Sequence, residues 1–188
     1  MFIGSEKELL AAFSEAGWIQ ANDLNVKSAI KTATATLRQT GYNDAPVSTL
    51  LLQGKAPDLV FQKSLNTFAK RHHLRIWQLT PTYGDRNVWV GAATHDIATT
   101  NERAGTKWSH RIDPHVDRER EWVQTDLLFI GSATAYAGVD RPSAPKQLSN
   151  ATGDTLLTDG KISVVELARS AGQKNKTSQS APTARPTD

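Results

Sequence analysis

The spacing of apolar residues predicts two helices near the start of the chain. Between residues 5 and 17, apolar side chains recur every three or four positions, which places them on one helical face: Leu9, Leu10, Phe13 and Ala16. Ser5 and Glu8 have the spacing of a capping box, and Gly17 is a residue type that commonly follows a helix. The segment 26–41 has the same apolar spacing and ends at a glycine, which predicts a second helix.

From residue 47 the apolar positions form short runs and alternations that are typical of strands. Two β-rich runs, VSTLLLQG and DLVFQKS, flank a KAP turn. HHLRIWQL and NVWVGAATHDIATT follow, and the turn residues at 79–87 between them predict an antiparallel hairpin. TKWSHRI predicts one more strand.

A third helix is predicted over residues 114–130. Asp113 is a favourable N-cap, and Pro114 suits the first helical position. The apolar residues of this helix share one face: Val116, Val123, Leu127 and Ile130. The following stretch, SATAYAGVDRPSAPKQLSN, is predicted to be irregular. DTLLTDGKISVVEL then predicts two strands joined as a hairpin at Asp159-Gly160.

Together these elements predict a single α+β domain with helices packed on a mostly antiparallel sheet. A chain of 188 residues, 38% hydrophobic and 22% charged, has the size and composition for one such core. The end of the chain is rich in polar residues and proline and has no apolar period. We therefore predict a folded domain over residues 1–168 and a disordered basic tail over residues 169–188.

The net charge of +3 belongs to that tail, which holds four of the 22 basic and one of the 19 acidic residues and so leaves 18 of each in the body. A neutral body argues against a nucleic-acid partner. No apolar run approaches the ~20 residues that cross a bilayer, and the N-terminus lacks the features of a signal peptide. We therefore expect a soluble domain in the cytoplasm or at the membrane surface. Without cysteine, disulfides and thiolate metal sites are excluded.

Histidine, arginine and acidic residues gather in the middle of the chain. All five histidines lie between residues 72 and 115. Alternation along HHLRIW places His73 and Arg75 on one side of a strand. If the hairpin pairs through its turn, these two residues approach His95. The next strand leads into HRIDPHVDRERE at a helix start, where the positive end of the helix dipole favours anions.

Two kinds of binding site fit this centre. An anion site would use the guanidinium fork and imidazole donors to hold phosphate or carboxylate. Its candidate residues are His73, Arg75, His95, His110, Arg111 and Asp113. A divalent metal site would combine histidine nitrogens with a carboxylate. Its candidate ligands are His95, Asp96, His110 and His115.

A third interpretation needs no ligand. The acids Glu119 and Glu121 can form ion pairs on a solvated helix face, and the histidines can be half-buried packing residues. The spacing matches no standard metal motif, and the chain has no nucleophile elbow, P-loop or dinucleotide-binding fingerprint, so we assign no catalytic residue.

The ordered set RHHLRIW, VWVGAATHDI, HRIDPHVDRERE and TGDTLLTDGKISVVEL resembles the LssY C-terminal domain family, from about AAFSEAGW to SVVEL. The resemblance implies a bacterial domain that often follows membrane segments similar to phosphatidic acid phosphatases or DedA-type proteins, and it supplies no reaction. A phosphate-bearing ligand, a lipid head group or a membrane-protein partner is therefore expected. We predict a polar His/Arg/Asp pocket that binds an anionic ligand near a membrane. The alternatives are a metal-assisted hydrolase that uses the same residues and an interaction module without a small-molecule site.

Overall fold

The computed structural model describes residues 1–21, 50–64, 71–101, 108–149 and 153–169, without the side chains of 98–101 and 108–110. The described residues form one α+β domain, mostly sheet, with the helices α1 (Glu6–Glu15) and α3 (Val116–Phe129). The strands are β1 (Phe2–Ile3), β2 (Ile19–Gln20), β3 (Leu59–Ser64), β4 (Arg71–Tyr83), β5 (Arg86–Asn101), β6 (Trp108–Ile112), β7 (Ala133–Asp140), β8 (Gln147–Ser149), β9 (Thr155–Leu157) and β10 (Lys161–Leu167).

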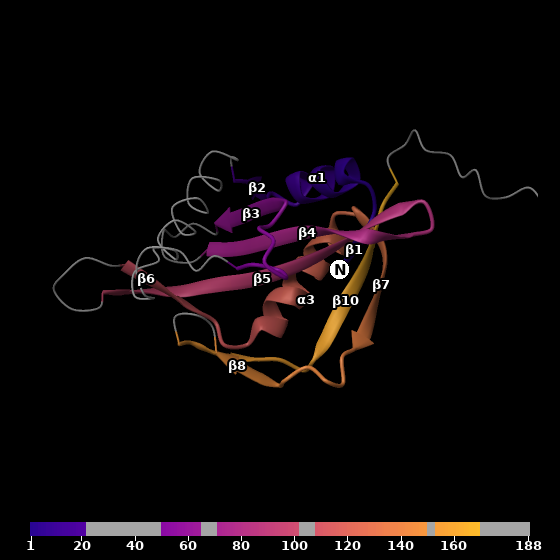
Figure 1. Cartoon of the computed structure of the whole chain (residues 1–188). Helices are drawn as coiled ribbons and strands as arrows, with labels where there is room; N and C mark the ends of the chain where they lie inside the picture. Colours follow the sequence, from indigo (N-terminus) through magenta and orange to yellow (C-terminus); the bar gives the residue numbers. More distant parts are fainter. Residues whose placement is uncertain (22–49, 65–70, 102–107, 150–152, 170–188) are drawn as a thin grey trace, which may run out of the picture.

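Eight of these strands form one twisted sheet in the order β2-β3-β4-β5-β1-β10-β7, with β6 paired to β5 (Figure 1). All pairs of neighbouring strands in this sheet are antiparallel except the parallel pair β1–β10. The expected mostly antiparallel sheet is therefore confirmed. The strands β8 and β9 form a separate two-stranded sheet. The long β4–β5 hairpin, predicted from its turn residues, lies at the centre of the main sheet.

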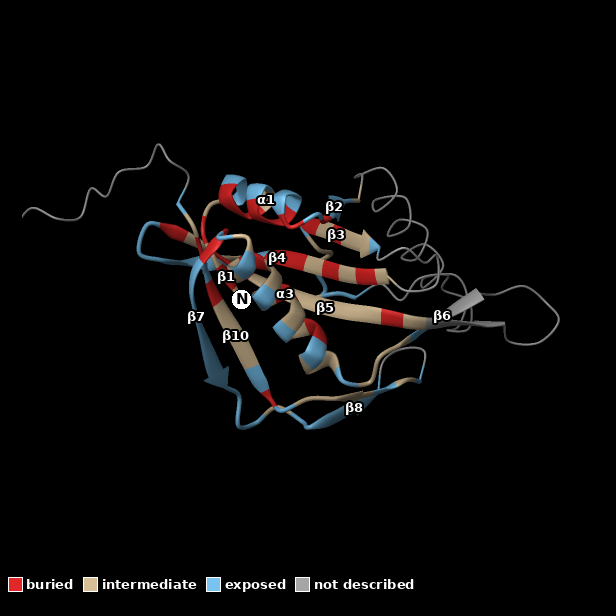
Figure 2. Ribbon diagram, turned by 180° about the vertical axis from the view of Figure 1, so that it is seen from behind, coloured by how far each residue is buried: buried red, intermediate tan, exposed pale blue. Residues whose placement is uncertain are grey.

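Side chains from both helices and from one face of the sheet form a single core. Helix α1 begins with the predicted capping box, in which the Ser5 hydroxyl accepts from the Glu8 amide and the Glu8 carboxylate accepts from the Ser5 amide. Buried positions alternate along β4, as Figure 2 shows. The core contains Phe2, Leu9, Ala12, Phe13, Ala16, Trp18, Leu59, Phe61, Leu74, Ile76, Trp89, Val123, Leu127, Ala133, Val165 and Leu167.

A buried guanidinium ties α1, β5 and β10 together. The Arg86 side chain, only 7% exposed, donates from Nη1 to Glu166 over 2.7 Å and from Nη2 to Glu8 over 3.2 Å. It also donates to the carbonyl oxygen of Leu167 over 2.7 Å. The Glu8 carboxylate therefore caps α1 and also balances a charge in the interior.

Three elements differ from the sequence-based prediction. The described part of VSTLLLQG, from residue 50, forms a turn closed by a bridge between Leu52 and Lys55 and not a strand. The segment predicted to be irregular forms β7 and β8, whose side chains are almost all exposed, so burial imposes no apolar alternation on it. The predicted helix at 26–41 and all but the first residue of the predicted tail at 169–188 lie outside the described residues.

The predicted hairpin at Asp159-Gly160 is wrong, because β9 pairs with β8 while β10 pairs with β7 and β1. The reason lies in contacts with α3. The Asp117 carboxylate accepts from the Thr158 hydroxyl over 2.9 Å and from the Asp159 amide over 2.5 Å. Arg120 holds the Asp159 carboxylate over 2.8 Å, so the chain is fastened to the helix at the point where a hairpin would turn.

The start of α3 also differs from the prediction. The N-cap position is His115, and its side chain makes no capping hydrogen bond. Asp113 lies two residues before it, and its carboxylate accepts from the His115 amide over 2.9 Å. The predicted N-cap at Asp113 is therefore displaced by two residues, because Asp117 and the 158–159 segment stabilise the first turn instead.

The contact between Arg120 and Asp159 gives a prediction for acid stability. The Arg120 hydrogen bond holds the pKa of Asp159 at about 2, below its ordinary 3.8. A depressed carboxylate pKa stabilises the fold above the ordinary value, and this contribution is lost as pH falls from about 4 towards 2. In Arg120→Gln this part of the pH dependence should disappear, as urea unfolding at several pH values would measure. The effect should be modest because the Asp159 side chain is 40% exposed. If the free energy of unfolding of Arg120→Gln changes with pH between about 4 and 2 as that of the wild type does, Arg120 is not the cause of the low pKa of Asp159.

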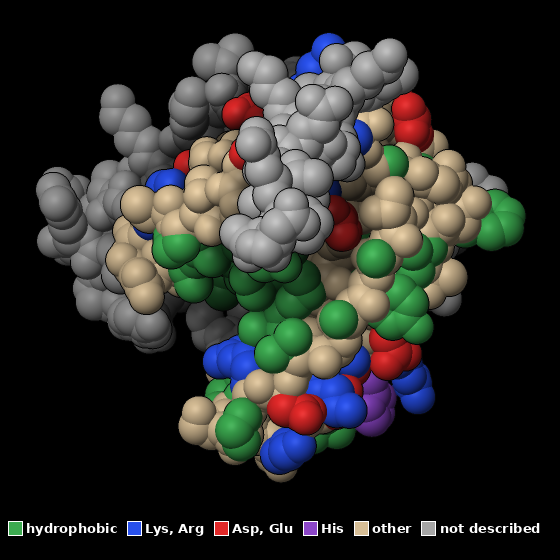
Figure 3. All heavy atoms as spheres, turned by 90° about the vertical axis from the view of Figure 1, so that its right-hand side faces the viewer, with side chains coloured by type: hydrophobic (Ala, Val, Ile, Leu, Met, Phe, Trp, Pro, Cys, Tyr) green, Lys and Arg blue, Asp and Glu red, His purple; other side chains and the backbone are tan. Residues whose placement is uncertain are grey.

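No helix among the described residues is long and apolar enough to cross a membrane. Strand β7 forms one edge of the sheet, and its exposed residues include Tyr136 and Val139. Figure 3 views the molecule from the side on which β7 lies and shows hydrophobic side chains at that surface.

Candidate metal centre

Three polar side chains form a row across neighbouring strands. Lys63 on β3 pairs with His72 on β4, and His72 pairs with His95 on β5. Residues directly opposite each other in antiparallel strands point to the same face, so all three side chains lie on the face that carries α3. The alternation that places Leu74 and Ile76 in the core therefore also buries His72.

Helix α3 presents a matching set of side chains over this row. Glu119, Trp122 and Asp126 lie three and four residues apart, so they share one helical face beside the apolar stripe of Val123 and Leu127. Each makes a contact with the row below it. The helix and the sheet thus enclose a polar cluster at the margin of the hydrophobic core.

His72 is at the centre of this cluster and is 5% exposed. Its Nδ1 atom lies 2.9 Å from each oxygen of Glu119, which is also 5% exposed. Its ring is stacked between Trp122, at 4.1 Å and 18°, and His95, at 4.3 Å and 9°. Its Nε2 atom is buried and has no hydrogen-bond partner among the described residues, so the ring is held by stacking, by the edge-on Trp18 ring at 6.5 Å and by Glu119.

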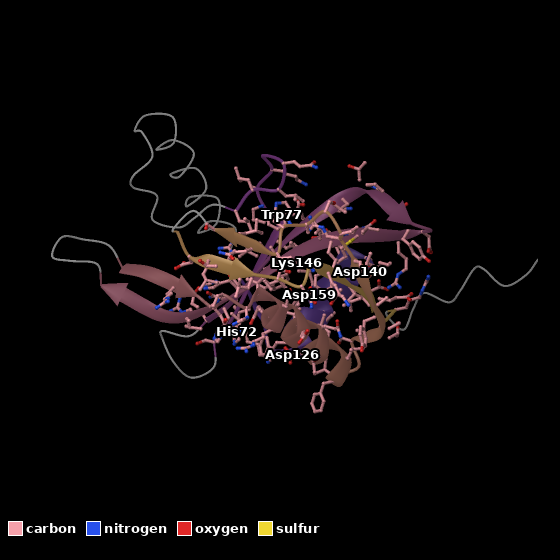
Figure 4. All side chains as sticks on the ribbon, turned by 90° about the horizontal axis from the view of Figure 1, so that it is seen from below. His72, Trp77, Asp126, Asp140, Lys146 and Asp159 are labelled. Atoms are coloured by element: carbon pink, nitrogen blue, oxygen red, sulfur yellow. The ribbon has the colours of Figure 1, made fainter. Side chains whose placement is uncertain are left out.

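Trp122 is also held by an ion pair. The Lys63 ammonium lies 4.8 Å from the centre of the Trp122 ring, and it donates to Asp126 over 2.8 Å and to the Ala16 carbonyl over 2.6 Å. The Trp18 indole donates to the same Asp126 carboxylate over 3.2 Å. These contacts fix Trp122, and Trp122 in turn fixes the plane of His72. Figure 4 labels His72 and Asp126 on the side of the sheet that carries α3.

His72, His95 and Glu119 together have the composition of a metal site. One ligand atom of each lies within 4.8 Å of the others. Burial, and next the nearby His72, lower the pKa of His95, although Glu119, Asp113 and Asp96 oppose this shift. A lowered pKa favours the neutral imidazole, the form that binds metals, at neutral pH. Two histidines and one carboxylate are a donor set for zinc or iron(II).

The structure separates the residues that the sequence suggested for a shared site. His73 pairs with Thr94 and Arg75 with Ala92, so both lie on the face opposite to His95. The predicted convergence is wrong because the observed register pairs His72, and not His73, with His95. An irregularity between Gln78 and Thr82 shifts this register from the one at the two-residue turn. His95 and Asp96 are consecutive in a strand and point to opposite faces, so they cannot share one ion as predicted.

The remaining predicted residues do not form one cluster either, as far as the structure describes them. The side chain of His110 lies outside the described residues, while Arg111 and His115 are exposed. Asp113 lies beside His95, since its amide donates to the His95 carbonyl over 2.9 Å. Whether any of these residues binds a ligand stays a prediction.

The sequence-based candidates did not include His72 and Glu119. One sequence-based interpretation placed Glu119 on a solvated helix face. In the structure Glu119 is buried against His72 instead. A signal for this was present in the sequence, because Glu119 lies four and eight residues before the apolar Val123 and Leu127 and so continues their stripe. For His72 the signal was its alternation with Leu74 and Ile76.

Comparison with known proteins identifies relatives at the level of a family. The family model described as LssY C-terminus matches residues 1–162. No curated protein and no solved structure gives a significant match.

Proposed function

The chain belongs to the LssY C-terminus family, and we propose that its domain binds one divalent transition-metal ion through His72, His95 and Glu119. The observation that carries this proposal is the grouping of the three ligand atoms within 4.8 Å, two of them on buried residues. The Glu119 carboxylate and Nδ1 of His72 partner each other in the interior. An ion held by the three residues would take the place of this contact and add His95 as a third ligand.

The distances are compatible with a shared ion after a small adjustment. Ligand atoms that lie about 2.1 Å from a tetrahedral zinc ion are separated by about 3.4 Å. The 2.9 Å between Nδ1 of His72 and the oxygens of Glu119 is shorter than this, so these two groups would move slightly apart on binding. The His95 nitrogen would move closer, since the upper limit of the group is 4.8 Å.

His95 must turn to bind, because the lone pair of an imidazole lies in the plane of its ring. The rings of His72 and His95 are nearly parallel, at 9°, so in this arrangement their lone pairs do not point at one ion. His95 is only half-buried, whereas Trp122 and Glu119 hold His72. We therefore expect metal binding to open the stack on the His95 side.

Three protein ligands would leave coordination positions for water. This is the pattern of catalytic metal sites, whereas structural zinc sites are usually closed by four protein ligands. A bound ion of this kind lowers the pKa of its water and supports hydrolysis at neutral pH. The proposed function is therefore that of a metal-dependent hydrolytic domain, and metal binding is its first testable step.

A zinc titration of two histidine variants tests the ligand assignment. The wild-type chain should bind about one equivalent of Zn²⁺ in competition with a chelating dye. His95→Ala should weaken binding by at least ~100-fold, since loss of a ligand exceeds the loss of an outer-shell partner. His115→Ala is the matched control, because His115 is exposed and outside the cluster, and it should bind as the wild type does. Equal affinities of all three proteins would exclude the proposed ligands.

A further inference from the structure

The second face of the sheet carries a separate group of polar side chains. On β4, alternation places His73, Arg75 and Trp77 on this face, away from His72. Across the strands, Arg75 lies between Val60 of β3 and Ala92 of β5. The Trp77 indole donates to the Lys55 carbonyl over 2.9 Å, so the turn after residue 50 covers that end of the group.

Arg75 is the unusual member of this group. Its neighbours across the sheet, Val60 and Ala92, offer no acceptor, and it makes no hydrogen bond or ion pair with any residue of the described part of the chain. Burial lowers the pKa of Arg75, and the charge of Asp96 opposes this shift without a direct contact. The guanidinium is thus partly removed from water without receiving a partner from the described residues.

The carboxylate whose charge acts on Arg75, that of Asp96, already has a partner. One oxygen of Asp96 lies 3.0 Å from Nε2 of His73, and Asp96 is 5% exposed. An arginine charge that is withdrawn from water and left unpaired destabilises a fold, so such a group generally has a counter-charge. The described residues supply none in contact with Arg75, which suggests that a bound anion does.

We propose that Arg75, with His73 beside it, binds a phosphate group on the sheet face opposite to the metal centre. The planar guanidinium presents paired N–H donors that match the oxygens of a phosphate. His73 is two residues away on the same face, and its side chain is 25% exposed, so it remains accessible to a ligand. The residues opposite these two, Ala92 and Thr94, carry no charge that would repel an anion.

This site is independent of the proposed metal centre. Consecutive residues of β4 and β5 serve the two faces, with His72 and His95 on one and His73 and Asp96 on the other. A failure of zinc binding would therefore not count against the phosphate site. A failure of phosphate binding would not count against the metal centre.

Titration with inorganic phosphate, followed by ³¹P NMR and thermal unfolding, tests the proposal. The wild-type full chain should bind phosphate saturably, with a rise in melting temperature at constant ionic strength. Arg75→Gln should weaken binding about 10- to 100-fold, and Arg75→Lys should recover only part of it because lysine lacks the fork. Arg118→Gln, at an exposed position on α3, is the control and should bind as the wild type does.

Two further arms identify the source of the phosphate group. If the ligand is a lipid, vesicles of phosphatidylcholine with phosphatidic acid should bind the wild-type chain and not Arg75→Gln. If it is a soluble phosphate, inorganic phosphate should bind the wild-type chain while the vesicles that contain phosphatidic acid do not. Absence of phosphate binding in every arm, or equal binding by Arg75→Gln, would overturn the proposal. If the Arg75→Gln protein fails to fold, Arg75→Lys decides the test. Phosphate binding by Arg75→Lys as strong as that of the wild type would then overturn the proposed role of the Arg75 guanidinium.

Discussion

Replacement of Arg86 by methionine is expected to lower the free energy of unfolding by about 3 to 5 kcal/mol, the range for breaking a buried ion pair from one side. The side chains of Arg86 and Glu8 are 7% and 3% exposed. Methionine would fill the volume but would leave the Glu8 carboxylate buried without its cation. The Leu167 carbonyl would lose its donor as well.

Urea unfolding of the Arg86→Met protein measures this effect. Arg141→Met is the control, because Arg141 is exposed, and its change should stay below ~0.5 kcal/mol. A loss below about 1 kcal/mol in Arg86→Met would show that water or another group replaces the pair, in conflict with the burial described here.

Glu119 and Glu121 should behave very differently although they are two residues apart. Glu119→Ala removes the carboxylate that holds the buried His72, so we expect a loss of about 2 to 3 kcal/mol. Glu121, with a side chain 66% exposed and 3.4 Å from Arg120, should cost less than ~0.5 kcal/mol when changed to alanine.

The two variants should also differ in metal binding. Glu119→Ala should lose the proposed zinc affinity and Glu121→Ala should keep it. Glu119→Gln adds a control for folding, since it preserves the shape of the side chain but removes its charge. Chemical denaturation and zinc titration of all three proteins provide the comparison. Equal stability of Glu119→Ala and Glu121→Ala would mean that the contact with His72 does not stabilise the fold.

The sequence predicted the elements whose signals are local. The capping box of Ser5 and Glu8, the β4–β5 hairpin and helix α3 all follow from residue types within one short segment. Strand β7 could not be found in this way, because its residues are exposed on both faces and show no apolar alternation. The hairpin expected at Asp159-Gly160 failed for a different reason. Contacts with Asp117 and Arg120, about 40 residues away, override the local turn preference.

The candidate site shows how far alternation can be used. It correctly separated His73 and Arg75 from His72 on β4, but it could not state which face of β5 each would meet. That depends on the length of the turn and on the irregularity between Gln78 and Thr82, and a register shift of one residue moves every side chain of a strand to the other face. The sequence therefore predicted His95 as a metal ligand candidate, while its actual neighbours His72 and Glu119 emerged only from the register and from the packing of α3.

X-ray absorption at the zinc edge of the zinc-loaded full chain tests the central claim most directly, because it reports the ligands of the ion themselves. We predict scattering from two imidazole rings together with carboxylate and water oxygens, as expected for His72, His95 and Glu119. In His95→Ala one imidazole should be lost from the same spectrum. A zinc spectrum without imidazole scattering, or one that is unchanged in His95→Ala, would contradict the proposed metal centre.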